Sequence, residues 1–146
     1  LKRGDKTLGI IEGFTGGLLA SSLSEAPGFS EVVSGGVVAS NPAGLQNYGV
    51  PEEVSDRWNS ATPASAEALA KAGQEFFGAD VGIGITALVV EATEASGPVG
   101  TAHMAFAVGD RVTTRSGSYP TQRLKIRSRA VTHALLELMA ALSSSG

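Results

Sequence analysis

The order of helical and strand-like segments along the chain predicts an α/β fold, a three-layer α/β/α sandwich around a mixed, roughly five-stranded sheet. Two apolar runs, at 6–14 and 80–90, have the length and composition of buried strands. A third segment, 99–119, alternates apolar and polar residues and is broken by Gly109-Asp110, which is typical of a β-hairpin. Helical segments lie between and after these strands, and the hairpin makes the sheet mixed.

The composition is that of one globular domain. The chain has 146 residues, of which 42% are hydrophobic and 17% charged, so it can bury one sizeable core. We expect a single domain over residues 1–142 and a flexible tail, "SSSG", over 143–146. Because Leu1 is not a natural start, upstream sequence is expected to be missing.

The first strand, 6–14, leads into a Gly-rich corner. Thr15 is expected to cap the helix that follows, and Gly16 and Gly17 leave room for the backbone to approach a ligand. The helix is predicted over 18–26, where Pro-Gly ends it.

The next segments are shorter. Residues 30–40 hold two Val pairs around Gly-Gly, which predicts a strand or a bent pair of strands. Residues 41–53 are rich in turn formers, and helix-forming residues resume at 52–58.

Thr62-Pro63 is a strong helix start, with threonine as cap and proline at the first position. Gly78 ends this helix. One face of it is predicted to carry Leu69, Ala72 and Phe76.

The second half of the chain predicts a central strand at 80–90, a loop at 91–98, the hairpin and a last helix over 122–142. The first hairpin strand points four side chains one way, and the last helix places five on one side. These are Ala102, Met104, Phe106 and Val108, and Ile126, Ala130, His133, Ala134 and Leu138.

Charge and cysteine content exclude several classes of protein. The net charge is -3, so the whole molecule is not a nucleic-acid binder, although six cations and no acid lie between Arg111 and Arg129. There is no cysteine, which excludes disulfides, thiolate zinc sites and cysteine nucleophiles. No apolar run reaches the ~20 residues that a membrane span needs. We therefore expect a cytoplasmic protein without membrane contact.

Five segments in order resemble the C-terminal domain of the CinA family, which includes stand-alone nicotinamide mononucleotide deamidases. They are "TGGLLASSLSEAPGFSEVVSGGVVASN", "GVPEE", "GADVGIGIT", "GPVGTAHMAFA" and the Arg-rich lead into the last helix. The resemblance covers nearly the whole chain and implies the same α/β/α fold. It also implies amide hydrolysis by a Ser/Lys/Tyr scheme, in which the lysine activates the serine.

The residues that this scheme needs are missing here. The family's serine position is Gly13, its tyrosine position is Ala39 and its lysine position is Gly44. The family's Gly-rich substrate loop has become Val89-Val90-Glu91. Ser40, Ser34, Ser21 and Ser22 have no Lys or His at a motif-like distance. The sequence therefore favours a domain without catalytic residues.

Other motif positions match the family and are the predicted ligand-binding residues: Glu12, Thr15, Gly16, Gly17, Asn41, Thr86, Arg123 and Arg127. Each also has a plain structural interpretation. Thr-Gly-Gly can be a cap and a turn, Glu12 can cap backbone donors, and the two arginines can be a solvated helix face. His103 and His133 are too separated to predict a metal site, and no cofactor is expected.

Three functions stay open. The first is a catalytically inactive relative of nicotinamide mononucleotide deamidase, retained for ligand binding or assembly. The second is an active amidohydrolase with a rearranged site, and the third is a structural, partner-binding domain. The ligand expected for the first is a phosphate-bearing small molecule at the Thr15-Gly16-Gly17 corner, bound by unpaired N–H groups of the helix start. A homodimer is expected because the family's helix before the first strand is absent.

Overall fold

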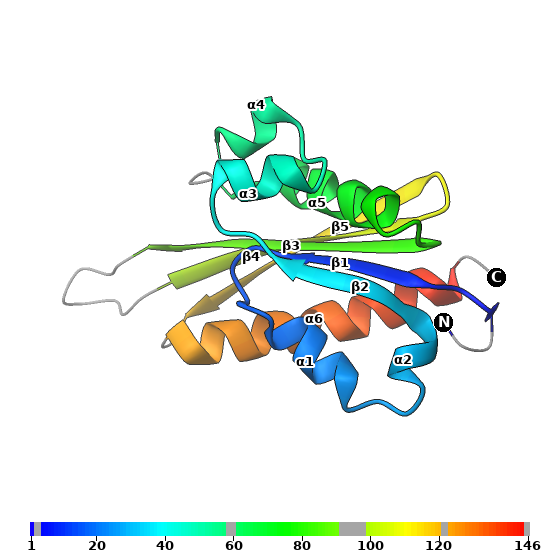
Figure 1. Ribbon diagram of the computed structural model, residues 1–146. Helices are drawn as coiled ribbons and strands as arrows, with labels where there is room; N and C mark the ends of the chain where they lie inside the picture. The colour runs from blue at the N-terminus through cyan, green and yellow to red at the C-terminus, as the bar shows by residue number, and fades with distance from the viewer. Residues whose placement is uncertain (2–3, 58–60, 91–98, 121–122, 145–146) are drawn as a thin grey trace.

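The computed structural model describes residues 1, 4–57, 61–90, 99–120 and 123–144 (Figure 1). The loop predicted at 91–98 and the end of the segment predicted at 52–58 lie outside the described residues. Five strands and six helices follow one another within them.

The five strands form one mixed sheet in the order β2-β1-β3-β4-β5. The strands β1, β2 and β3 run parallel, whereas β4 and β5 are antiparallel additions joined by the predicted hairpin turn. The sheet confirms the predicted fold class. The strand bounds are Leu8–Glu12 (β1), Val33–Val38 (β2), Val81–Val90 (β3), Val99–Val108 (β4) and Arg111–Pro120 (β5).

Helices cover both faces of the sheet and complete the three layers. Figure 1 shows α3, α4 and α5 on one face and α1, α2 and α6 on the other. Their bounds are Leu18–Ser24 (α1), Phe29–Val32 (α2), Pro42–Asn47 (α3), Glu52–Ser55 (α4), Pro63–Phe76 (α5) and Arg123–Ser143 (α6).

Two short helices differ from the sequence prediction. Helix α2 begins the segment 30–40, which was predicted as strand throughout, and α3 lies in the segment 41–53, predicted as turns. Helices of four and six residues span too few turns to show a 3.6-residue periodicity, so the pattern could not reveal them.

The main core lies between the sheet and α6. Phe106, Met104 and Ala102 point to this side as predicted, and they pack with Ala130, Ala134 and Leu138 of α6. All six side chains are at most 4% exposed. Burial of this size is the main source of stability in a domain of this length.

The opposite face is packed differently, because α5 lies with its backbone directly against the sheet. A Cβ placed on Gly9, Gly82 or Gly84 would overlap a carbonyl oxygen of α5. Leu69 and Ala72 are buried here as predicted, but Phe76 is 52% exposed. Its ring instead packs edge-on against Tyr48 of the α3 region, at 4.9 Å between centroids.

The helix ends follow local capping rules. Thr62 caps α5 as predicted: its hydroxyl accepts from Ser65 N at 3.1 Å, while Ser65 Oγ accepts from Thr62 N at 2.8 Å. Gly78 takes a φ of 56° after the helix.

At the C-terminal end of the chain, the flexible tail predicted for residues 143–146 was placed too early in the sequence. Ser143 still belongs to α6, and Ser144 N donates to Ala140 O.

Within the described residues, no helix combines the length and apolarity that crossing a bilayer requires.

Candidate functional site

Glu12 is the centre of the corner between β1 and α1. Its side chain is 1% exposed, and its carboxylate accepts hydrogen bonds from Leu19 N at 2.8 Å and Ala20 N at 3.0 Å. The hydroxyl of Thr15 donates to the same carboxylate. A carboxylate at a helix N-terminus satisfies backbone donors and the positive end of the helix dipole together. Glu12 therefore caps α1 from the end of the preceding strand.

The role predicted for Thr15 as the cap of α1 is wrong. The N-cap residue is Gly17, with a φ of 95°. As a glycine it has no side chain that could cap the helix. Thr15 accepts instead through its carbonyl, from Leu18 N at 3.1 Å. The expected unpaired N–H groups of the helix start are also already occupied, because Leu18, Leu19 and Ala20 all have acceptors.

A second corner, between β2 and α3, lies beside the first. Its N-cap is Asn41, whose side chain accepts from Gly44 N at 2.8 Å. Ala39 N donates to Glu12 O at 3.0 Å, which ties the two corners together. The side chain of Ala39 is 4% exposed and packs in an apolar cluster with Leu45.

The structure brings the substituted motif positions together. A Cβ placed on Gly44 would lie 3.9 Å from the Cβ of Ala39. Gly13 follows directly on Glu12, and its N–H donates to Ile85 O of β3 at 2.9 Å. The three positions thus converge on the ends of adjacent parallel strands, where α/β proteins commonly place their sites.

Phe14 and Arg127 close the first corner on the α6 side. The guanidinium carbon of Arg127 lies 5.4 Å from the centroid of the Phe14 ring, a cation–π distance. Its Nε is buried and has no hydrogen-bond partner among the residues that the structure describes. The other predicted arginine, Arg123, begins α6, but its side chain lies outside the described residues.

Thr86 is buried on β3 and opens a polar row that the sequence analysis did not identify. Across the sheet it pairs with His103 of β4, which pairs with Ser116 of β5. His103 Nδ1 and Ser116 Oγ are 2.7 Å apart. Burial lowers the pKa of His103 below its ordinary value. The hairpin register was the signal available in the sequence, since it places residues 103 and 116 opposite each other.

His133 takes part in a chain of polar contacts between α6 and β5. Its Nδ1 lies 2.7 Å from the hydroxyl of Tyr119, and its Nε2 lies 3.5 Å from Glu137. Glu137 also accepts from Arg115 Nε at 3.0 Å. Burial raises the pKa of Tyr119. In the described part of the chain no three His, Cys, Asp or Glu side chains gather as metal ligands would.

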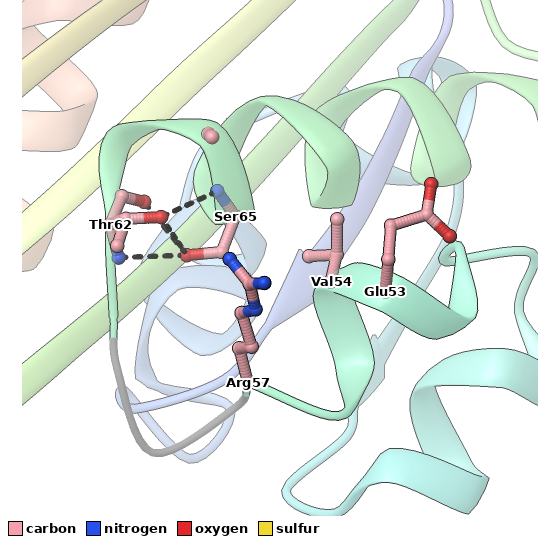
Figure 2. A pocket seen from close by; sticks show the side chains of 6 residues that line it. Glu53, Val54, Arg57, Thr62 and Ser65 are labelled. Carbon is pink, nitrogen blue, oxygen red and sulfur yellow. Dashed lines mark hydrogen bonds between the residues drawn. The ribbon is translucent and has the colours of Figure 1, made fainter.

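A pocket lies away from both corners. It has a volume of about 460 Å³ and lies between α4 and the start of α5 (Figure 2). Thr62 and Ser65 in its wall are used by the capping box of α5. None of the predicted ligand-binding residues lines it. Its lining residues are Glu53, Val54, Arg57, Thr62, Ala64 and Ser65.

Residues 1–142 match the family model of the CinA C-terminal domain. A CinA-like protein of Gemmatimonas aurantiaca is 35% identical over 141 residues, which is 95% of this chain and 33% of that protein. A CinA-like protein of Mycobacterium marinum is 37% identical over 143 residues, again 95% of this chain and 33% of that protein. The chain thus spans about a third of the length of the curated relatives it matches.

Solved structures share the architecture. A CinA superfamily protein from Escherichia coli superposes with a TM-score of 0.83 at 25% identity, covering 94% of this chain and 81% of that one. A competence or damage-inducible protein from Enterobacter asburiae gives a TM-score of 0.81 at 23% identity, covering 97% and 91%. The second likeness concerns the fold alone.

Proposed function

The chain belongs to the CinA C-terminal domain family, and we propose that it is inactive as a nicotinamide mononucleotide deamidase and is retained for ligand binding or assembly. The chemistry it lacks is the hydrolysis of the nicotinamide mononucleotide amide, which the resemblance to the family's Ser/Lys/Tyr enzymes would imply.

The observation that carries this proposal is the convergence of Gly13, Ala39 and Gly44. Two of them have no side chain, and the third is a buried methyl group in an apolar cluster. A hydroxyl needs a base within hydrogen-bond reach to act as a nucleophile. These three positions supply neither the hydroxyl nor the base, although the surrounding backbone is in place.

The ligand that we propose is a phosphate-bearing small molecule bound weakly near Arg127. The buried Nε of this arginine has no protein partner in the described residues, and an anion would give it a charge-assisted hydrogen bond. Glu12 already occupies the N–H groups of Leu19 and Ala20. The helix start therefore adds little to binding, and a negative ligand is repelled by that carboxylate.

For assembly we propose a homodimer, because the apolar side chains of Leu136 and Met139 on α6 are 62% and 66% exposed. Unpartnered apolar surface favours association.

Two alternatives to the proposed function lead to different measurements. An active amidohydrolase with a rearranged site would release ammonia, and a purely structural domain would bind neither phosphate nor nucleotide.

The test is ammonia release from nicotinamide mononucleotide, with an active CinA-family deamidase assayed side by side. We expect no release above background, because loss of an entire nucleophile–base unit removes several powers of ten in rate. Turnover comparable to the active relative would refute the proposal.

Light scattering over a wide concentration range tests the dimer, which a constant monomer mass would exclude.

A further inference from the structure

His103 and Ser116 form a side-chain pair that the family resemblance does not explain. They lie directly opposite each other on β4 and β5, and Nδ1 and Oγ are 2.7 Å apart. Both point to the α5 side of the sheet, because Thr114, two residues before Ser116 on β5, bonds Glu67 of α5. Ser116 is exposed to solvent, whereas His103 is half-buried.

We propose that His103 and Ser116 are a base and a nucleophile, and that Ser116 accepts acyl groups from small uncharged esters. The distance is that of a working nucleophile–base hydrogen bond. In the tautomer with its proton on Nε2, His103 presents an unprotonated Nδ1 to the serine hydroxyl. The lowered pKa of His103 keeps the imidazole neutral, and so able to accept a proton, at neutral pH.

The reaction requires no co-reactant besides the ester and water. Ser116 Oγ bonds to the acyl carbon as its proton passes to His103 Nδ1. The bond to the leaving alcohol then breaks, and the alcohol takes that proton, which leaves an acyl ester on Ser116. Water attacks this ester by the same route and releases the carboxylic acid. A histidine in this role contributes about 10²- to 10⁴-fold to the rate.

The neighbouring rows of the sheet define the substrate class. The row on one side of the pair is Gly84, Ala105 and Thr114, and the row on the other side is Leu88, Thr101 and Ser118. None of these six residues has a charged side chain, although Thr114 donates to the carboxylate of Glu67, and Leu88 is 43% exposed. A surface of hydroxyls, small residues and one open leucine favours a neutral ester over a charged one.

The experiment is acylation of the purified protein with p-nitrophenyl acetate. We expect a stoichiometric burst of nitrophenolate and a mass increase of one acetyl group, mapped by peptide mass spectrometry to Ser116. Ser116→Ala abolishes the burst, and His103→Gln slows it at least about a hundredfold. Ser128→Ala is the control, an exposed serine of α6 on the opposite face of the sheet, and it leaves the burst unchanged. Circular dichroism confirms that each variant is folded.

The pH profile separates base catalysis from ordinary serine reactivity. With neutral His103 as the base, the acylation rate rises with pH and levels off, with its midpoint below pH 6.5. The inference is overturned if no acetyl group is found on Ser116, if Ser116→Ala keeps the burst, or if His103→Gln acylates at the wild-type rate. None of these readouts depends on ammonia release, so this inference and the proposed function can fail separately.

Discussion

The corners that follow β1 and β2 lie side by side at the same end of the sheet, yet their helices are capped in different ways. At the β1 corner the cap is Glu12, a buried carboxylate that bonds N–H groups seven and eight residues later. At the β2 corner the cap is Asn41, an exposed side chain that bonds the N–H three residues later. The first corner depends on one buried charge, and the second follows an ordinary local rule.

Both corners nevertheless teach the same lesson about the family motifs. The matched residues Glu12 and Asn41 each satisfy a helix start, so the fold needs them whether or not there is chemistry. Ala39 and Gly44 make no side-chain hydrogen bond, and Gly13 contributes only its backbone N–H. At the two corners Glu12 and Asn41 hold the backbone, and we propose that the side chains missing at positions 13, 39 and 44 are the ones that would react.

The largest effect is expected for Glu12→Ala. It leaves two backbone N–H donors of α1 and the hydroxyl of Thr15 without their acceptor, and each lost partner of a buried group costs about 1–3 kcal/mol. We expect the free energy of unfolding to fall by about 3 kcal/mol or more in chemical denaturation. Glu53→Ala, at an exposed acid of α4, is the control and should change it by less than about 0.5 kcal/mol. A loss no larger than the control's would mean that water replaces the carboxylate.

Restoring the family's side chains at positions 13, 39 and 44 tests whether these three positions alone decide the activity. The triple variant Gly13→Ser, Ala39→Tyr, Gly44→Lys should still release no ammonia from nicotinamide mononucleotide. Ala39 is buried, so a tyrosine overpacks its cluster at about 1–3 kcal/mol. A Cβ at position 44 lies 3.3 Å from Asn41 Oδ1 and crowds the cap. Ammonia release by the triple variant would show that the backbone alone retains a working site.

Removal of the local cap should have a smaller effect. Asn41→Ala deletes one exposed hydrogen bond to Gly44 N, and such caps contribute about 1 kcal/mol. We expect a decrease of that size in the free energy of unfolding, well below the effect of Glu12→Ala under the same conditions. Asn41→Asp should be nearly neutral because aspartate caps equally well. Equal losses for Asn41→Ala and Glu12→Ala would remove the distinction between the corners.

Phosphate binding should give the smallest effect. We expect a dissociation constant in roughly the millimolar range by calorimetry, with nicotinamide mononucleotide binding no more tightly. Arg127→Met should abolish the signal, and Lys125→Met, at a nearby exposed cation of α6, should preserve it. Tight binding of the mononucleotide would show that a nucleotide pocket is open beside Phe14.

The sequence predicted the sheet well because its strands are long, apolar or alternating, and bounded by glycine. It also offered a cap of backbone donors as the structural interpretation of Glu12, and the hydrogen bonds from Leu19 N and Ala20 N confirm that Glu12 caps α1. It misassigned Thr15, because a threonine before a helix resembles a local cap, whereas the acceptor here comes from the preceding strand. Capping over seven residues leaves no local pattern to detect.

The His103–Ser116 pair escaped prediction for a related reason. The two residues are 13 positions apart, and only the strand register brings them together. The serines near the family motifs in sequence lie around β1 and β2, whereas the pair lies on β4 and β5, at the other side of the sheet. Phe76 was predicted to lie with Leu69 and Ala72, but at this end of α5 it is the Phe77 ring that lies against the sheet, beside Gly9 and Gly35.

The glycines beneath α5 make the two faces of the sheet unequal in the substitutions that they tolerate. On the α6 side, large side chains fill the space between layers, so one volume can be exchanged for another with repacking. On the α5 side there is no space to exchange, because Gly9, Gly82 and Gly84 meet helix backbone directly. Even one added methyl group there must move the whole helix, and with it the bond between Glu67 and Thr114. Gly9, Gly82 and Gly84 thus fix the distance between α5 and the sheet, whereas side-chain volume sets that distance on the α6 side.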